Sequence, residues 1–265
     1  MKIIVCVKEV LDPSAVNNYV QAGALKIGAD GMTLEAAAVP RIINGYDEQA
    51  LEAAARIRDS GKECHITAVT VGTEKGAMLR HCSALGADEV VAIDPEVTEV
   101  DGHVVANILS AYIRNRGGTD LILCGRQASD DDQGVTSALL AEKLGLPIAM
   151  FARSVIVESG KVRVTEVTPD GDRVVDAQMP VVVTVSNEIG TPRFPTAAAK
   201  LVARKKKPIE ITATSLGLTR EELTARVRLI RQFVPQVQGN CEFLEGAPAE
   251  VARQLVERLR AQSLI

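Results

Sequence analysis

A polar loop that leads into an amphipathic stretch is the part of the sequence best suited to chemistry. Residues 125–145 read GRQASDDDQGVTSALLAEKLG and directly follow the apolar run Asp120–Cys124. The first backbone N–H groups of a helix have no partner within it and attract anions, and Gly134 lets a phosphate approach the backbone closely. Three hydroxyl groups could add donors, those of Ser129, Thr136 and Ser137. The loop therefore predicts an anion site suited to a phosphate.

Three adjacent carboxylates, Asp130-Asp131-Asp132, complicate this interpretation because they repel a phosphate. They could cap the following helix and favour its N-terminus by about 0.3–1 kcal/mol each. They could instead bind Mg²⁺, but adjacent residues of a loop do not readily converge on one point. We favour a third hypothesis, in which the acids hold ribose hydroxyls or neighbouring amides while main-chain amides hold the phosphate.

A second polar patch, Asn44-Gly45-Tyr46-Asp47-Glu48, precedes another amphipathic stretch. Asn44 or Asp47 could simply cap that helix. Alternatively, the patch lies beside the carboxyl end of the first strand, next to the loop 125–137. The two loops would then form the walls of one cleft for an adenine nucleotide.

Motifs for self-sufficient catalysis are absent from the sequence. It has no G-x-G-x-x-G after the first strand, no G-x-x-x-x-G-K-[ST] and no G-x-S-x-G. The three histidines fall within apparent strands or helices, so a Ser-His-Asp arrangement has no natural candidates. The pairs Cys64-His65 and His81-Cys82 are better explained as parts of regular elements than as metal ligands. We therefore expect a module that holds a nucleotide, with no catalytic residue and no metal.

Composition narrows the class of protein. The 265 residues are 46% hydrophobic and 24% charged, which predicts a folded chain of one large domain or two small ones. A net charge of -4 and the absence of tryptophan disfavour a nucleic-acid partner. No apolar run reaches the ~18–20 residues of a membrane span, and the N-terminus does not read as a signal peptide. Five scattered cysteines without C-x-x-C favour the reducing cytoplasm.

The elements that position the two polar loops follow an alternating pattern. Continuous apolar runs, typical of buried parallel strands, occupy Met1–Val7, Ile66–Val71, Glu89–Ile93 and Asp120–Cys124. Apolar residues at i, i+3, i+4 and i+7, typical of helices, occupy Asp47–Asp59, Lys75–Leu85 and His103–Arg114. The alternation predicts an α/β fold with a doubly wound, mostly parallel sheet of the adenine-nucleotide-binding type.

Two segments depart from this alternation. Residues 9–43 contain several Gly and Pro and predict a long excursion with a small hairpin around Ala29-Asp30-Gly31. Beyond Met150, short apolar runs separated by turn residues predict an antiparallel meander added to the sheet. The strands of this meander would be Val155–Val157, Lys161–Val167, Arg173–Ala177 and Val181–Val185.

The C-terminal part reads differently again. Residues 197–207 predict a helix that ends in Arg204-Lys205-Lys206-Lys207, and these cations either cap the helix or dock an acidic partner. Thr219–Phe233 and Pro248–Ala261 predict charged amphipathic helices. We divide the chain into an α/β nucleotide-binding domain, residues 1–208, and a C-terminal helical arm, residues 209–265. The arm would pack back on the sheet or wrap a partner chain.

Together these motifs resemble the beta subunit of electron-transfer flavoproteins. The resemblance rests on MKIIVCVKEV, N-x-x-D-E-x-A-L-E-A-A at 44–54, G-R-Q-A-x-D at 125–130, L-A-E-K-L-G-L-P, P-V-V-V-T-V and P-R-F-P-T…K-K-K-P-I-E. It runs from Met1 to about Glu210. It implies an electron-carrier subunit rather than a self-sufficient enzyme, paired as a heterodimer with an alpha subunit that holds most of the FAD. Electrons would pass from a flavin dehydrogenase to a quinone oxidoreductase or another acceptor.

The resemblance also implies a nucleotide in the beta subunit. Ordinary members hold AMP, whereas electron-bifurcating members hold a second FAD that takes a hydride from NADH. The triple Asp favours AMP, and Asp47 favours the bifurcating alternative. Carried over by position, Tyr46 would lie near the alpha-bound flavin. The pocket would consist of Cys6, Asn44, Gly45, Tyr46, Asp47, Val71, Gly125, Arg126, Gln127, Ala128, Ser129, Asp130, Asp131, Asp132, Gln133, Gly134, Val135 and Thr136.

A partner-docking surface is implied near the end of the resemblance. Many members grip an acyl-CoA dehydrogenase with a Leu just after P-R-[FY]-x-T, where this sequence has Ala197. The smaller side chain buries less apolar surface, by about 2 kcal/mol. We therefore expect the basic run to carry more of the docking, in a surface made of Arg193, Ala197, Arg204, Lys205, Lys206 and Lys207. A stand-alone nucleotide-binding domain, without flavin or partner, is the remaining alternative.

Overall fold

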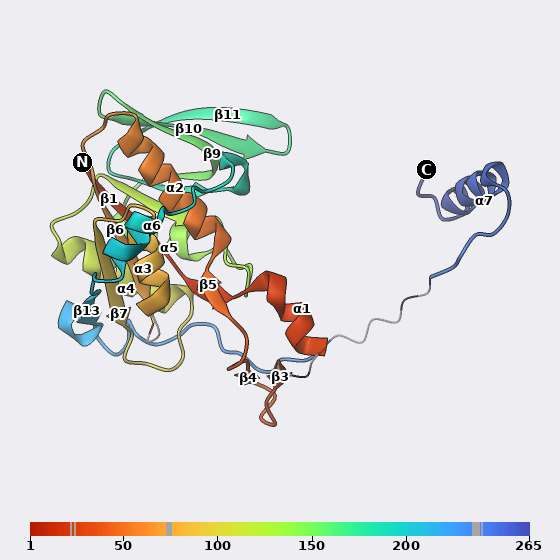
Figure 1. The fold of residues 1–265 in the computed structure, drawn as a ribbon, viewed down its shortest axis with the longest axis horizontal. Helices are drawn as coiled ribbons and strands as arrows, with labels where there is room; N and C mark the ends of the chain where they lie inside the picture. The colour runs from red at the N-terminus through yellow and green to blue at the C-terminus, as the bar shows by residue number, and fades with distance from the viewer. Residues whose placement is uncertain (22, 24, 73–75, 235–238, 240) are drawn as a thin grey trace. The chain divides into compact units, whose positions relative to one another are not determined.

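The computed structural model in Figure 1 describes residues 1–21, 23, 25–72, 76–234, 239 and 241–265. The chain forms two compact units, Met1–Ile230 and Arg231–Ile265. The first unit is built on a nine-stranded sheet of order β11-β10-β9-β12-β8-β1-β6-β7-β13. Strand β13 (Ile209–Thr212) pairs with β7, so the sheet continues past residue 208, where the sequence predicts the arm to begin.

The centre of the sheet is parallel and buried. Its strands are β1 (Lys2–Cys6), β6 (His65–Val71), β7 (Glu89–Asp94) and β8 (Leu121–Gly125). Strand β1 lies between β6 and β8, and β7 lies beyond β6. The interior residues of each strand are buried, as expected for strands covered on both faces. The four predicted strands are confirmed, with ends shifted by at most one residue.

Helices cover both faces of the sheet. The helices are α2 (Gly45–Asp59), α3 (Gly76–Ala84), α4 (Gly102–Asn115) and α5 (Thr136–Leu144). Residues of α2 and α3 belong to one apolar cluster and residues of α4 and α5 to another, and alternate residues of β1 contribute to each cluster. The α/β fold with a large, mostly parallel sheet is therefore present. Lys75, where the sequence predicts α3 to begin, lies outside the described residues.

The excursion over residues 9–43 contains more regular structure than the sequence indicates. Its elements are β2 (Glu9–Leu11), α1 (Pro13–Gln21), β3 (Lys26–Ile27), β4 (Leu34–Glu35) and β5 (Arg41–Ile43). The predicted hairpin is confirmed as the antiparallel pair β3 and β4. Strands β2 and β5 pair with each other, so the chain returns to the end of β1 and enters α2 there.

The antiparallel addition has three strands, not four. They are β9 (Ile148–Glu158), β10 (Lys161–Thr168) and β11 (Gly171–Gln178), joined by hairpins. The fourth predicted strand, β12 (Val181–Val185), is instead parallel to β8 and β9 and lies between them. All of β12 is buried, whereas β10 alternates exposed and buried residues. A continuous buried run is typical of a parallel strand inside a sheet. The turn residues before this run led us to predict an antiparallel strand instead.

The segments after β12 differ from the prediction in two places. They contain a 3-10 turn (Asn187–Ile189), α6 (Ala197–Ala203), β13, a second 3-10 turn (Thr214–Leu216) and, in the second unit, α7 (Pro248–Ala261). Helix α6 ends before the basic run, with Arg204 as its C-cap. Residues 219–233 form no helix. Glu222 accepts hydrogen bonds from Thr219, as in a helix cap, but Val227, Leu229 and Ile230 are exposed and give a helix no buried face.

Candidate functional site

Three loops meet at the carboxyl edge of the parallel sheet. The first follows β1 and contains Lys8, the second follows β5 and passes through Asn44 into the first turn of α2, and the third is the loop 126–135 after β8. Ligands bind at this edge in open α/β sheets. The contacts described next confirm the prediction that the two polar patches lie side by side.

Asn44 connects the two patches directly. Its Nδ2 donates to the carbonyl of Gln127 at 2.8 Å, and its Oδ1 accepts from the N–H of Ser129 at 3.2 Å. Asn44 occupies the N-cap position of α2, but its side chain makes no capping hydrogen bond, so the capping interpretation of this side chain is wrong. Because Asn44 is buried, its two hydrogen bonds fix the loop after β8 against the start of α2.

Asp47 joins the first turn of α2 to the ends of two strands. Its Oδ2 accepts from the N–H of Lys8 at 2.8 Å, and its Oδ1 accepts from the N–H of Gly125 at 3.0 Å. Burial raises the pKa of Asp47 to about 7, because the neutral amides offset only part of the cost of a buried charge. A Cβ on Gly125 would lie 2.8 Å from backbone and side-chain atoms of Tyr46, so this close packing requires glycine.

The three adjacent carboxylates are paired within the site. Lys8 Nζ lies 2.7 Å from Asp130 Oδ1 and 3.2 Å from Asp131 Oδ2, and Asp132 accepts from Nε2 of Gln127 at 2.9 Å. Lys8 therefore offsets two of the charges that would repel a phosphate. In the described part of the chain, no group of three or more His, Cys, Asp or Glu residues is placed to hold a metal ion.

The start of α5 offers backbone donors to an anion. Helix α5 begins at Thr136, and its N-cap, Val135, provides no side-chain hydrogen bond. No acid occupies the first turn, so the interpretation of the three Asp as helix caps is wrong. Gly134 has φ 62°, and a Cβ there would lie 2.9 Å from the carbonyl oxygen of Arg126. The first amides of α5 have no side-chain cap and can bind an anion, and glycine at 134 is required by its left-handed backbone and by the Arg126 carbonyl packed against it.

Other predicted pocket residues lie at the same edge with different surroundings. Cys6 and Cys124 are paired in register on β1 and β8, and Val71 ends β6. The hydrogen bond with Cys6, together with burial, raises the pKa of the Cys124 thiol well above its usual range. This disfavours the Cys124 thiolate, the form in which a cysteine acts as a nucleophile.

Arg126 packs on two aromatic rings. Its guanidinium carbon lies 4.9 Å from the ring centre of Phe151 and 5.7 Å from that of Tyr46. Sequence reasoning missed Phe151, because the meander was predicted to start only at residue 155. The one signal was an aromatic residue among the small side chains just after Met150.

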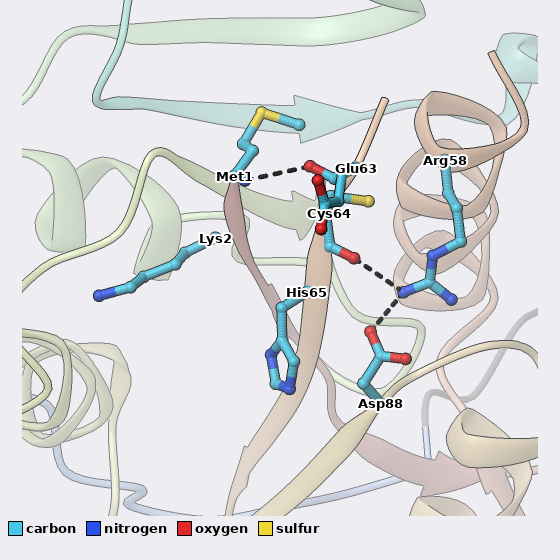
Figure 2. Close-up of a pocket in the computed structure, with 7 residues that line it drawn as sticks. All are labelled: Met1, Lys2, Arg58, Glu63, Cys64, His65 and Asp88. Carbon is cyan, nitrogen blue, oxygen red and sulfur yellow. Dashed lines mark hydrogen bonds and ion pairs between the residues drawn. The ribbon is translucent and has the colours of Figure 1, made fainter. Parts of the chain in front are cut away.

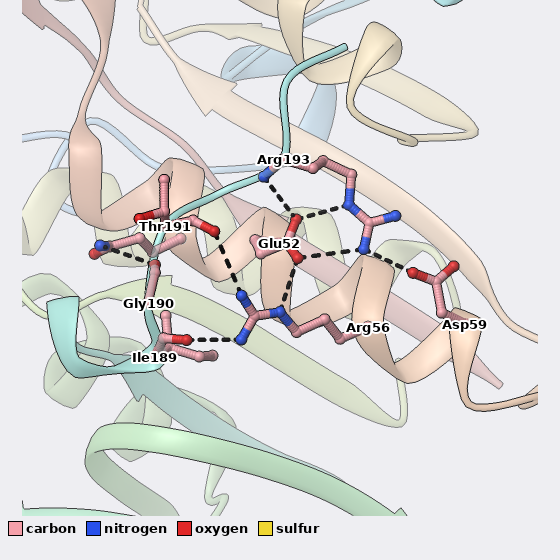
Figure 3. Close-up of polar contacts among 8 residues, drawn as sticks. Glu52, Arg56, Asp59, Ile189, Gly190, Thr191 and Arg193 are labelled. Carbon is pink, nitrogen blue, oxygen red and sulfur yellow. Dashed lines mark hydrogen bonds and ion pairs between the residues drawn. The ribbon is translucent and has the colours of Figure 1, made fainter. Parts of the chain in front are cut away.

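The predicted docking segment is fastened to α2 (Figure 3). Glu52 accepts from the backbone N–H and Nε of Arg193 at 3.1 and 2.7 Å, and from Nε of Arg56 at 2.8 Å. Arg56 also donates to the carbonyl of Ile189 at 2.6 Å, and Arg193 pairs with Asp59 at 2.7 Å. Arg193 is thus engaged within the chain.

The surface that follows is apolar and basic. Phe194 is 90% exposed, and Leu201 and Val202 of α6 are also largely exposed. Ala197 is exposed at the start of α6. Lys206 points inward to the carbonyls of Ala87 and Asp88, whereas the rest of the basic run is exposed: Arg204, Lys205 and Lys207.

A separate pocket lies at the amino ends of β1 and β6, the opposite edge of the sheet (Figure 2). Its lining residues are Met1, Lys2, Arg58, Glu63, Cys64, His65 and Asp88. Arg58 is bound by Asp88 and by the carbonyl of Cys64, and the amine of Met1 donates to the carbonyl of Glu63. Arg58, Asp88 and the Met1 amine are thus engaged by contacts within the chain.

The comparisons with known proteins agree with the motifs. A family model described as electron transfer flavoprotein domain matches residues 31–216. The electron transfer flavoprotein subunit beta of Megasphaera elsdenii is 30% identical, and that of Thermoanaerobacterium thermosaccharolyticum is 32% identical, each alignment covering 100% of both chains. The subunit beta of Bacillus subtilis is 32% identical over 84% of this chain and 88% of its own. Within the described residues, no helix is both long and apolar enough to span a bilayer.

Proposed function

This chain belongs to the electron transfer flavoprotein family as a beta subunit, and on that premise we propose that it holds AMP in the loop Gly125–Thr136 and pairs with an FAD-binding alpha subunit. The heterodimer would carry electrons from a flavin dehydrogenase to a quinone oxidoreductase or another acceptor. The free cysteines suit the reducing cytoplasm as its location.

The observation that carries this proposal is the anion site at the start of α5. The backbone amides from Thr136 onward would hold the phosphate, and the left-handed Gly134, packed against the Arg126 carbonyl, would set the path of the loop into α5. Lys8 balances the negative charges of Asp130 and Asp131, and the buried Asn44 holds the loop through hydrogen bonds to the backbone of Gln127 and Ser129. No side chain of this site is assigned a general acid or base role.

FAD bound by the alpha subunit would supply the electron-accepting and electron-donating chemistry, and the protein would set its geometry and polarity. In this arrangement Tyr46 would lie near the flavin bound by the alpha subunit. The AMP would be a structural component that keeps the loop after β8 in place.

We assign redox-partner docking to the exposed surface Phe194, Leu201 and Val202 with the neighbouring basic run. Phe194 and Leu201 offer the apolar area that Ala197 lacks. Arg204, Lys205 and Lys207 would attract an acidic rim on the partner. Helix α7 of the second unit has no buried residue, and its apolar side chains would pack on the alpha subunit.

The first test is a count of nucleotides released by acid from the purified heterodimer with its cognate alpha subunit. One FAD and one AMP per heterodimer is the expected result. Two FAD and no AMP would favour the electron-bifurcating alternative, which Asp47 supports, and reduction by NADH would be assayed next. A chain that forms no complex with alpha and carries no flavin would leave only a stand-alone nucleotide-binding domain.

The Gly134→Ala variant tests the position of the nucleotide. The added Cβ meets the carbonyl oxygen of Arg126 at 2.9 Å, so we expect AMP content to fall at least tenfold while FAD content is kept, an estimate of about 1.4 kcal/mol or more. Gly145→Ala is a matched control, since Gly145 has a similar φ of 67° but open space around it. Equal AMP content in the two variants would contradict the proposed site.

A further inference from the structure

Phe151 has a backbone conformation that bulky residues rarely adopt. Its φ is 56°, in the left-handed region. Phe151 lies in β9, where the register with β12 shifts between Val183 and Val185 and the register with β10 shifts between Thr165 and Glu166. The strand therefore bulges at Met150–Phe151 on the side of β12 and, further along the strand, at Arg153 on the side of β10. Bulges and left-handed residues of this kind persist only where the surroundings fix them, and they often redirect a side chain.

Two buried polar side chains fix the bulge. Thr184 Oγ1 accepts from the N–H of Phe151 at 2.8 Å, and Glu166 Oε1 accepts from the N–H of Met150 at 2.8 Å. Both acceptors are buried, and Arg173 also donates to Glu166, at 2.7 Å. Each side chain supplies an acceptor where the regular ladder of the sheet is interrupted. The conformation of Phe151 is therefore built into the fold.

The bulge brings the ring of Phe151 to Arg126, whose backbone is itself held. The N–H of Arg126 donates to the carbonyl of Val185 at 3.0 Å, and its carbonyl lies against Gly134. The Phe151 ring lies 4.9 Å from the guanidinium carbon, and Tyr46 contributes a second ring. Backbone and side chain of Arg126 are thus both placed before any ligand arrives.

A second arginine over an aromatic ring differs in one respect. Arg116 lies 5.5 Å from the ring centre of Tyr112 and also forms an ion pair with Glu89. Across the residues that the structure describes, Arg126 forms no ion pair, and its guanidinium has a polar side-chain contact with Gln127 at 3.2 Å. The charge of Arg116 is balanced by the Glu89 carboxylate. The charge of Arg126 is not balanced by an acid of the described residues, and it lies at the edge of the sheet where ligands bind.

We propose that Phe151 is a positioning residue of the cofactor site, which with Tyr46 holds the Arg126 guanidinium as a fixed cation for a phosphate of a bound nucleotide cofactor. This inference rests on the proposed function, which supplies the cofactor. The phosphate comes either from AMP in the beta loop or from FAD of the alpha subunit. Both present the same chemistry to a guanidinium, and the experiment separates them.

The test uses the heterodimer, freed of nucleotides, in wild-type form and as the variants R126Q, F151L, F151Y and the control R116Q. Binding is measured for AMP and for adenosine, and for FAD and for riboflavin. AMP and adenosine differ only in the phosphate group, whereas riboflavin lacks both the pyrophosphate and the adenosine of FAD and serves as the flavin ligand without phosphate. A residue that merely supports the fold would change the affinities for both ligands of a pair alike, whereas a residue that places a cation would change the affinity for the phosphorylated one.

We expect R126Q to weaken binding of one phosphorylated ligand by about tenfold and F151L by about threefold, with the unphosphorylated ligand unchanged. F151Y keeps the ring and should bind like wild type, as should R116Q. Loss confined to AMP assigns the phosphate to the beta loop, and loss confined to FAD assigns it to the alpha subunit. R126Q leaves the bulge intact, so it tests the cation even where a change at Phe151 harms folding.

Equal weakening of both ligands of a pair, or wild-type binding by R126Q and F151L, would overturn the inference. A wild-type heterodimer that binds neither AMP nor FAD would instead defeat the proposed function, and the role of Phe151 with it. The outcome in which wild type binds and the variants bind equally well removes only the role of Phe151 and Arg126.

Discussion

Asp47 and Glu52 lie on the same helix and both have little exposed surface, yet their pKa values are shifted in opposite directions. Asp47 is 7% exposed and Glu52 is 6% exposed. Asp47 is held mainly by neutral amides, and its pKa is raised to about 7. Burial would also raise the pKa of Glu52, but hydrogen bonds from Arg193 and Arg56 outweigh this cost and lower it. Charged partners can outweigh the cost of burying an acid, as Arg193 and Arg56 do for Glu52.

The two acids also serve different parts of the molecule. Asp47 joins α2 to the ends of β1 and β8 beside the candidate cofactor loop. Glu52 joins α2 to the segment that leads to the surface proposed for docking. At the N-terminus of α2, ionisation of the buried Asp47 is unfavourable, and this residue lies beside the candidate cofactor loop. In the middle of α2, Glu52 is ion-paired with Arg56 and Arg193. Three changes would break or sharpen this comparison.

The largest effect expected is the pH dependence that Asp47 imposes. Because its pKa is raised in the folded chain, the folded state binds this proton more tightly than the unfolded state. Its contribution to stability is therefore fully present below pH 3.8 and is lost as the pH rises through about 7. The difference between the two pKa values corresponds to about 4 kcal/mol.

The Asp47→Asn variant cannot ionise and should lack this part of the pH dependence. The free energy of unfolding of the full chain would be measured by denaturant titration at several pH values between about 4 and 8. The wild type should lose stability relative to the variant as the pH rises. Parallel curves for the two proteins would show that Asp47 does not carry a raised pKa.

Glu52→Gln should have a smaller effect of the opposite sign. Because the pKa of Glu52 is lowered, its contribution is present above about pH 4.5 and is lost as the pH falls. We expect a loss of about 2 kcal/mol near neutral pH, since charged hydrogen bonds to Arg193 and Arg56 are weakened. The same denaturant titrations check this, and hydrogen exchange should rise in residues 189–193. If the loss of unfolding free energy in Glu52→Gln became larger as the pH falls, the comparison would be refuted.

Asp59→Asn should have the smallest effect. Asp59 also pairs with Arg193, but its side chain is 58% exposed, so we expect a loss of about 0.5 kcal/mol or less. It is the matched control for Glu52→Gln, since both changes remove a carboxylate partner of the same arginine. A loss as large as that of Glu52→Gln would mean that burial of the acid adds nothing to the network.

The sequence predicted the parts of the fold and site that follow from local pattern. The apolar runs located the parallel strands, and the rule that parallel strands end at one edge brought the patch 44–48 to the loop 125–137. Asn44 and its contact with Gln127 confirm that placement. The position of β12 in the sheet was predicted wrongly. Because turn residues precede its apolar run, the run was assigned to the antiparallel meander, whereas β12 pairs in parallel with β8 and β9.

Contacts between distant residues could not be predicted in this way. The pairing of Lys8 with Asp130 joins positions 122 residues apart, and no local pattern encodes it. The same holds for Arg193, predicted for a docking role, whose guanidinium is engaged by Glu52 and Asp59. Phe151 depends on acceptors from two other strands, Thr184 and Glu166, and its bulge is therefore visible only in the folded chain.

The contacts in Figure 3 that hold residues 189–193 on α2 are made largely with main-chain groups, so they do not depend on the outward-facing side chains that follow. Arg56 binds the carbonyls of Ile189 and Thr191, and Glu52 binds the backbone N–H of Arg193, groups that almost any residue would provide. Substitutions at Phe194 or along the exposed face of α6 therefore leave these main-chain attachments in place. On the proposed docking role, changes to this surface would alter the choice of redox partner without disturbing α2 or the cofactor loop.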